Sequence, residues 1–114
     1  MPSFEQGDVV RVPFPYSDRS ARQRRPAFVV SAGGIGEKDG LLWVVMITSA
    51  ENRPWPDDLS LGKLYRESGL PSPSVIRPCK LATIEASHAE PLGRIEPTLL
   101  AEVTSALRGY LGFR

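Results

Sequence analysis

The stretch LLWVVMITS, residues 41–49, decides the fold expected of this chain. Its apolar part, rich in Val and too short to span a membrane as a helix, is typical of a buried β-strand. A second run of this kind, PAFVVSA at residues 26–32, precedes it. Between the two lie Gly33, Gly34, Gly36 and Gly40. We therefore expect two neighbouring strands joined by a hairpin-like connection, with Trp43 in the core.

Further short strands are expected on both sides of this pair. Residues 8–14 alternate, with Val10, Val12 and Phe14 on one face and Val9, Arg11 and Pro13 on the other. The run at residues 74–81 is interrupted by Pro78, which indicates an edge strand or a bulge. Residues 82–84 and 92–95 resemble two more strands around a turn at residues 88–91.

The pattern changes to helical spacing after Pro97. Apolar residues recur there at Leu99/Leu100, Val103, Ala106/Leu107 and Tyr110/Leu111, and Pro97 suits the first helical position. Residues 50–73 are long for a structureless loop, so a helical turn is expected within residues 59–67. The predicted fold is mainly β, with the strands closed into a small barrel and one C-terminal helix packed on it.

Composition restricts the functions that are open to the chain. Its 114 residues, of which 41% are hydrophobic and 24% charged, predict one domain over residues 1–114. Fourteen basic and 13 acidic residues leave a net charge of +1, which argues against a protein that coats nucleic acid but not against a local basic site. One His and one Cys exclude the common zinc sites and an internal disulfide. We expect a cytoplasmic protein with no metal, cofactor, secretory signal or membrane span.

The strongest local signal is the run RSARQRR at residues 19–25, which holds four arginines and no acid. Guanidinium groups match the geometry of phosphate oxygens, so this loop is a candidate phosphate-binding site; the alternative is a solvated basic loop. Arg25 stands apart from Arg19, Arg22 and Arg24, because it precedes Pro26 at the start of a strand, where the sheet can fix its direction.

Several other residues have two interpretations each. The hydroxyls of Thr48 and Ser49, at the end of a strand, either donate to a substrate oxygen or satisfy local backbone. Arg77 either pairs with a carboxylate or points at a ligand. Trp55, between two prolines, is expected to be exposed and able to stack on a base or a partner. His88 and Cys79 have no obvious catalytic partner, and Asp57 and Asp58 alone do not make a metal site.

An ordered series of short motifs resembles the MazF/PemK (Kid-like) family of toxin endoribonucleases from type II toxin–antitoxin systems. The series runs GDVVRV (7–12), RPA (25–27) with FVVS (28–31), MITS (46–49), GL (69–70) with PSV (73–75), KLATI (80–84) and LGRI (92–95). The resemblance implies a small SH3-like β-barrel of the MazF/PemK/CcdB-like kind. It also implies a homodimer that holds RNA in a groove between its subunits, and metal-independent, sequence-specific cleavage of single-stranded RNA, such as mRNA.

The resemblance also suggests which residues act. It assigns Arg25, Thr48 and Arg77 to catalysis. Kid-like members carry an aspartate two positions after the last of these and a histidine in the first loop, whereas this chain has Cys79 and no first-loop histidine. A mechanism built on Arg25 and Thr48 therefore fits better than one that needs the missing groups. The residues expected to bind RNA are Arg19, Arg22, Arg24, Ser49, Trp55 and Lys80.

Cleavage by the RNA's own 2′-OH needs neither an enzyme nucleophile nor a metal, and it leaves a 2′,3′-cyclic phosphate and a 5′-OH. Arg25 is then expected to donate a proton to the leaving oxygen, because a guanidinium is almost never neutral. The base stays open between Ser49, Asp18 and water.

A cognate antitoxin is the expected protein partner. Its acidic side chains would face residues 19–25 and its apolar ones would lie near Trp55 and Tyr16. Two alternatives remain: a non-catalytic SH3-like module that binds RNA or a peptide, and a toxin of the related gyrase-poison type.

Overall fold

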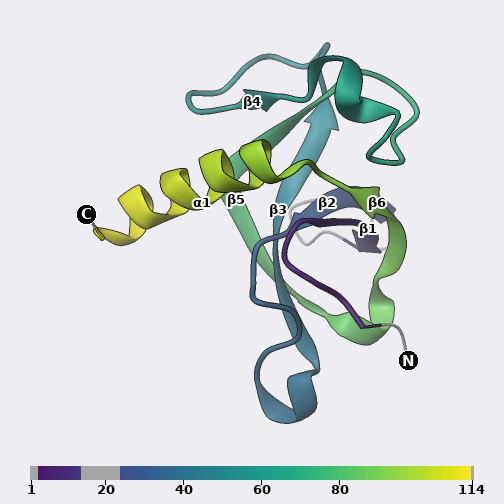
Figure 1. Ribbon diagram of the computed structural model, residues 1–114, viewed down its shortest axis with the longest axis vertical. Coiled ribbons are helices and arrows are strands. Elements are labelled where there is room, and N and C mark those ends of the chain that lie inside the picture. The colour runs from purple at the N-terminus through teal and green to yellow at the C-terminus, as the bar shows by residue number, and fades with distance from the viewer. Residues whose placement is uncertain (1–2, 14–23, 114) are drawn as a thin grey trace.

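The computed structural model describes residues 3–13 and 24–113. These residues form one six-stranded sheet, short 3-10 helices and a C-terminal α-helix (Figure 1). The elements are β1 (Asp8–Pro13), β2 (Arg24–Val29), η1 (Glu37–Asp39), β3 (Leu41–Ser49), β4 (Leu59–Ser60), η2 (Gly62–Tyr65), β5 (Ser74–Glu85), η3 (Ala86–His88), β6 (Glu90–Arg94) and α1 (Pro97–Leu111).

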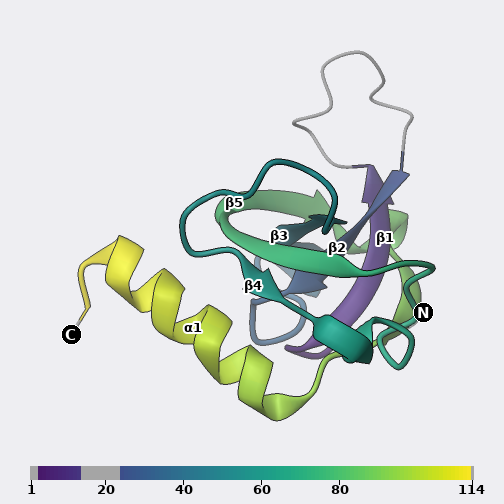
Figure 2. The ribbon, with the colours of Figure 1, turned by 90° about the horizontal axis from the view of Figure 1, so that it is seen from above.

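The strands lie in the order β4-β5-β3-β2-β1-β6, and every neighbouring pair is antiparallel. The sheet curls into a half-barrel, and α1 lies along its outside with its C-terminal end projecting away (Figure 2). The mainly β fold with a C-terminal helix is thereby confirmed. The hairpin between the two Val-rich runs is confirmed too, since Ala27, Phe28 and Val29 pair with Met46, Val45 and Val44.

The two strands expected at residues 74–81 and 82–84 are one strand, β5, and that prediction was wrong. The register against β3 jumps from Val45↔Leu81 to Met46↔Arg77, so residues 78–80 form a bulge. Pro78 has no N–H to give to the ladder, and a bulge absorbs this loss without ending the strand. Pro78 had indicated either an edge strand or a bulge. The structure has the bulge, because β5 lies between β4 and β3 and is not an edge strand.

Both faces of the sheet are buried, which is why the central strands are apolar throughout. One core gathers Val10, Val12, Ala27, Val44 and Met46 with the N-terminal Phe4 and with Ile84. The opposite core gathers Val9, Phe28, Val45, Ile47 and Ile76 with Leu99 and Val103 of α1. The alternation predicted for residues 8–13 thus divides β1 between two cores; Phe14 lies outside the described residues.

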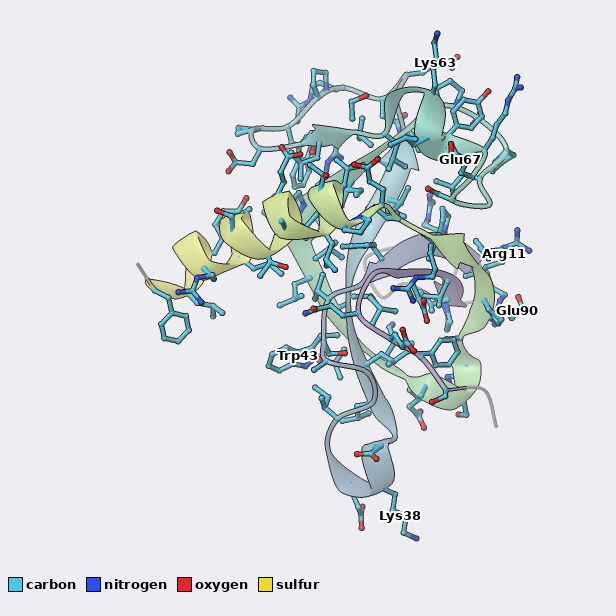
Figure 3. All side chains as sticks on the ribbon, in the orientation of Figure 1. Arg11, Lys38, Trp43, Lys63, Glu67 and Glu90 are labelled. Atoms are coloured by element: carbon cyan, nitrogen blue, oxygen red, sulfur yellow. The ribbon has the colours of Figure 1, made fainter. Side chains whose placement is uncertain are left out.

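Trp43 is a correction to the predicted core. Its side chain shares a face with Val45 and Ile47, but the first half of α1 covers those two residues and leaves Trp43 45% exposed. Figure 3 shows Trp43 projecting from the sheet, and the cleft that it lines is closed on the other side by the C-terminal half of α1.

The remaining turns agree in part with those predicted from the sequence. A helical turn occurs within residues 59–67, as η2, and β4 precedes it. The turn expected at residues 88–91 lies earlier, as η3, so β6 begins at Glu90 instead of Leu92. Among the described residues, no helix has the length and apolar character that crossing a membrane requires.

Candidate functional site

Three neighbouring strands bring Arg25, Thr48 and Arg77 to one face of the sheet. Met46 pairs with Ala27 of β2 on one side and with Arg77 of β5 on the other. Alternate residues of a strand share a face, so Arg25 lies on the face of Ala27, and Thr48 lies on the face of Met46. The register of β2 and β3, continued by two residues, sets Arg25 opposite Thr48.

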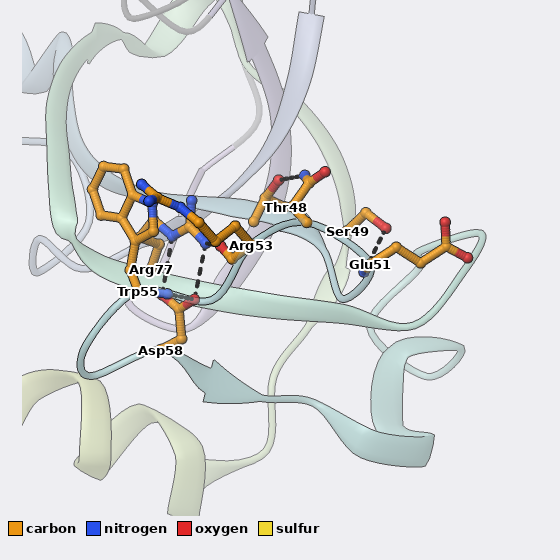
Figure 4. Close-up of polar contacts among 8 residues, drawn as sticks. Thr48, Ser49, Glu51, Arg53, Trp55, Asp58 and Arg77 are labelled. Carbon is orange, nitrogen blue, oxygen red and sulfur yellow. Dashed lines mark hydrogen bonds and ion pairs between the residues drawn. The ribbon is translucent and has the colours of Figure 1, made fainter.

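Thr48 is the second-last residue of β3, and its side chain is directed into the site. The residue is 7% exposed, and its Oγ1 accepts a hydrogen bond of 2.6 Å from Asn52 Nδ2 (Figure 4). Because that bond occupies a lone pair, the hydroxyl proton of Thr48 is left to donate elsewhere. The neighbouring Ser49 Oγ accepts from the backbone N–H of Glu51 at 3.1 Å, which satisfies local backbone.

Arg77 is held on several sides by the loop that follows β3. Its Nε and Nη2 donate to the two carboxylate oxygens of Asp58 at 3.0 and 2.9 Å, and Nη2 also donates to the Arg53 carbonyl at 3.0 Å. The Trp55 ring covers the guanidinium, whose central carbon is 4.4 Å from the ring centroid (Figure 4). The side chains of Arg77 and Asp58 are 6% and 9% exposed. Of the two interpretations of Arg77, the structure has the ion pair.

This pairing determines the protonation of Asp58. Burial by itself raises the pKa of the carboxyl, but the hydrogen bonds from Arg77 and from the Trp55 N–H, with the charge of Arg77, more than offset it. The pKa of Asp58 therefore lies below its ordinary value, and the group stays ionised. A carboxylate of this kind is a weak base and a strong acceptor, which suits it to orienting Arg77.

The turn that carries Asp58 is also tied to α1. Trp55 N–H donates to Asp58 Oδ2 at 2.9 Å, and Asp58 N–H donates to the Trp55 carbonyl at 3.2 Å. Asp57, at the corner of this turn, has φ +70° and accepts a hydrogen bond of 2.9 Å from the Tyr110 hydroxyl. Partial burial and the nearby Asp57 carboxylate raise the pKa of Tyr110 to about 12.

The other predicted RNA-binding residues are dispersed. Lys80 joins the site, with its Nζ 4.9 Å from the centroid of the Trp55 ring. Arg24 does not, because its guanidinium donates to the carbonyls of Arg11 and His88 and lies 3.4 Å from a Glu90 oxygen. Arg19 and Arg22, like Tyr16 and Asp18, lie outside the described residues. Trp55, expected to be exposed, is half-buried and stacked on cations.

Cys79, at the position where Kid-like members carry an aspartate, lies in a separate apolar cleft of about 510 Å³. This cleft separates the strand pair β3–β5 from the C-terminal part of α1. The large side chains around it are Trp43, Leu81, Tyr110, Leu111 and Phe113, which are all exposed.

Asn52 and Asp58 were not predicted as members of the site. Asp58 is 19 positions before Arg77 in the chain, and no local pattern links the two. The register of β4 against β5 does so, because Leu59 pairs with Ile76 and the preceding residue therefore falls beside Arg77. Among the described residues, no cluster of three or more His, Cys, Asp or Glu side chains is arranged to hold a metal ion.

Comparisons with known proteins agree with one another. A family model for the PemK-like, MazF-like toxin of type II toxin–antitoxin systems matches residues 5–111. The crystal structure of MazF (Form-I) from Deinococcus radiodurans is similar, with 25% identity, a TM-score of 0.76 and coverage of 99% of this chain and 100% of that one.

Two complexes share the fold at lower identity, and a comparison with curated proteins found no match. MazE–MazF (Form-II) from Deinococcus radiodurans has 23% identity and a TM-score of 0.74, with 100% of each chain covered. An endoribonuclease in complex with its cognate antitoxin from Mycobacterial species has 19% identity and a TM-score of 0.71, with 100% of this chain and 98% of that one covered. The chain belongs to the PemK-like, MazF-like toxin family of type II toxin–antitoxin systems.

Proposed function

We propose that this chain is a toxin endoribonuclease that cuts single-stranded RNA at a short sequence without a metal ion. The observation that carries the proposal is the register of β2, β3 and β5, which gathers Arg25, Thr48 and Arg77 on one face of the sheet. Family membership supports the same activity, since one structural relative is described as an endoribonuclease.

In the proposed reaction the ribose 2′-hydroxyl gives its proton to a base, with Ser49, Asp18 and water as the candidates. Its oxygen attacks the adjacent phosphorus, and the bond from phosphorus to the 5′-oxygen breaks. The products are a 2′,3′-cyclic phosphate and a 5′-hydroxyl that has gained a proton. The protein must hold the two oxygens in line and stabilise the charge that builds on the phosphoryl oxygens. Fixed hydrogen-bond donors meet both needs.

Arg25 and Thr48 are the proposed donors to the scissile phosphate, and Arg25 also protonates the leaving oxygen. Arg77 contributes positive charge from the neighbouring strand. Its Nη1 makes no hydrogen bond to any described residue and is the part of the guanidinium proposed to reach the RNA. Trp55 and Lys80 lie beside Arg77, and the other residues proposed to bind RNA are Arg19, Arg22, Arg24 and Ser49.

Incubation of the purified chain with long single-stranded RNA in EDTA tests the proposal. We expect discrete fragments with 5′-hydroxyl ends, and a loss of rate of about 10²- to 10³-fold in Arg25→Ala. Arg11→Ala is the matched control, because it removes one exposed arginine of β1 that lies on the opposite face of the sheet from Arg25, and it should leave the rate unchanged. Intact RNA across varied sequences would refute the nuclease and favour a binding module.

We propose that two copies associate through the apolar cleft beside α1. The support is the concentration of large exposed apolar side chains there, since contiguous apolar patches of this kind mark interaction surfaces. A second copy would cover Trp43 and Cys79 together with the end of the helix.

The proposed protein partner is a cognate antitoxin, and the proposed compartment is the cytoplasm. Two relatives were solved with such partners, as MazE–MazF and as an endoribonuclease with its antitoxin. An acidic segment that follows the arginine-rich residues 19–25 and reaches Trp55 would exclude RNA from the same face.

A further inference from the structure

The loop at residues 50–58 contacts both Thr48 and Arg77. Arg77 holds this loop at three points, namely the Arg53 carbonyl, the Trp55 ring and the Asp58 carboxylate. A guanidinium that is nearly buried and bonded in this way loses most of its freedom, and so does the loop attached to it. The beginning of the same loop carries Asn52, whose side-chain amide reaches back to Thr48.

The contact between Asn52 and Thr48 is not needed to close the turn after β3. The backbone N–H of Asn52 already donates to the Ser49 carbonyl at 3.1 Å, and Ser49 Oγ accepts from Glu51. The side-chain bond of 2.6 Å is therefore additional. Its effect falls on Thr48, because a hydroxyl oxygen that accepts from an amide has its own proton directed elsewhere.

We infer that Asn52 is a positioning residue of the site, which orients the Thr48 hydroxyl so that it donates to the phosphoryl oxygen of the RNA. The inference rests on the proposed function and adds a residue to it. Arg77 then acts at a distance as well, because its three contacts hold the loop from which Asn52 reaches Thr48. Without the amide, the Thr48 hydroxyl rotates freely, and each turnover must select the productive orientation.

Substitutions at Asn52 separate this role from general effects on the fold, since the residue is exposed. Asn52→Ala removes the donor, and we expect kcat to fall roughly 10-fold with little change in KM. Asn52→Asp keeps the shape but reverses the hydrogen bond, because a carboxylate accepts the Thr48 proton. We expect a fall in kcat approaching about 100-fold.

The added negative charge needs a matched control, and Ala50→Asp supplies it. Ala50 is exposed in the same loop, so this variant adds the same charge and leaves the hydrogen bond from Asn52 to Thr48 in place. It should change KM and leave kcat as in the wild type. In a Thr48→Val background, Asn52→Ala should have no further effect, because the group through which it acts is gone.

Three results would overturn the inference. Wild-type kcat in Asn52→Asp would mean that the direction in which the Thr48 hydroxyl donates has no effect on catalysis. Equal losses for Asn52→Ala in the wild-type and Thr48→Val backgrounds would mean that Asn52 acts independently. The third is an Asn52 side-chain amide resonance, observed by ¹⁵N–¹H NMR, that does not move in Thr48→Val, which would show that the hydrogen bond is not made.

The NMR measurement needs no activity, so it also separates the two proposals. If the wild type cuts no RNA, the proposed function fails. The shift of the Asn52 resonance then still decides whether the amide holds Thr48.

Discussion

The ion pair between Arg77 and Asp58 is the residue-scale feature on which the site is built. Two charges that are almost completely buried require partners for their remaining donors and acceptors. The Arg53 carbonyl, the Trp55 N–H and the Trp55 ring meet that requirement. All these partners come from one loop, so the pair keeps the loop in place, and removal of either charge leaves the other buried and uncompensated.

The lowered pKa of Asp58 predicts how stability depends on pH. Its pKa is 3.8 in an unfolded chain and lower in the folded one, so the folded state binds the proton less readily. The stabilisation is therefore complete above the unfolded value and is lost as the pH falls through the folded value. We expect the free energy of unfolding, measured with urea between about pH 6 and pH 3, to fall more steeply in the wild type than in Asp58→Asn.

The wild type and Asp58→Asn share all other carboxylates, so the difference between their pH curves reports on Asp58 alone. Curves that run parallel over the whole range would contradict the assignment of an ionised, paired Asp58. Asp58→Asn should also be less stable at every pH where the carboxylate is charged, since it leaves Arg77 without its anion.

At the scale of elements, the segment after η2 packs closely against β6. The backbones of residues 68–69 and 92–93 approach so closely that positions 69 and 93 have no room for a Cβ. A Cβ at Gly69 would lie 2.2 Å from the Leu92 carbonyl oxygen, and one at Gly93 would lie 2.5 Å from that of Ser68. This approach explains why the motif GL at 69–70 and the motif LGRI at 92–95 occur together.

Gly69→Ala is expected to destabilise the fold by about 3 kcal/mol or more. Its φ of +84° costs a residue with a Cβ about 1–2 kcal/mol, and the clash with Leu92 adds about 1–3 kcal/mol of overpacking. Gly62→Ala is the control, because Gly62 also has a positive φ, +55°, but no heavy atom within 4 Å of the added Cβ. Thermal or urea unfolding of both variants measures the loss in the free energy of unfolding. Equal losses in Gly69→Ala and Gly62→Ala would show that the clash with Leu92 contributes nothing.

At the scale of the whole molecule, the cleft beside α1 gathers most of the large apolar side chains that are exposed among residues 3–13 and 24–113. Leu111 and Phe113 at the end of the helix are 67% and 62% exposed, and Trp43 faces them from the sheet. Because Cys79 opens into this cleft, dimerisation would also bury the thiol. The cleft lies on the α1 side of the sheet, whereas Thr48 lies on the face of Met46, so a dimer of this kind leaves the site accessible.

We expect sedimentation to give twice the 12.5 kDa chain mass for the wild type and the single chain mass for Leu111→Glu. Leu41→Glu is the matched control, since Leu41 is an exposed leucine of β3 that does not line the cleft, and it should remain dimeric. A monomeric wild type, or a Leu111→Glu variant of unchanged mass, would reject this surface as the interface.

Local patterns determined most of the fold and part of the site. Val-rich runs, glycine-rich connections and the helical spacing after Pro97 specify strands and helix by themselves, because burial periodicity is a property of neighbouring residues. Arg25 and Thr48 could be predicted as candidate site residues from local sequence, because one lies near the start of such a strand and the other near the end of one. Pro78 indicated an irregularity but not that β5 continues beyond it.

Only the tertiary structure decided what each side chain meets. Trp43 is exposed because α1 packs over Val45 and Ile47 but not over Trp43. Arg77 is paired because the two-residue strand β4 places Asp58 beside it. Asn52 reaches Thr48, four residues before it, from the beginning of a loop that Arg77 holds further along. The contacts of Trp43 and Arg77 join positions that are distant in the chain, and the sequence pattern of either partner does not contain the register that brings them together. The sequence by itself determined which strands and which donors this protein has, and the packing of those strands decided which donors lie together.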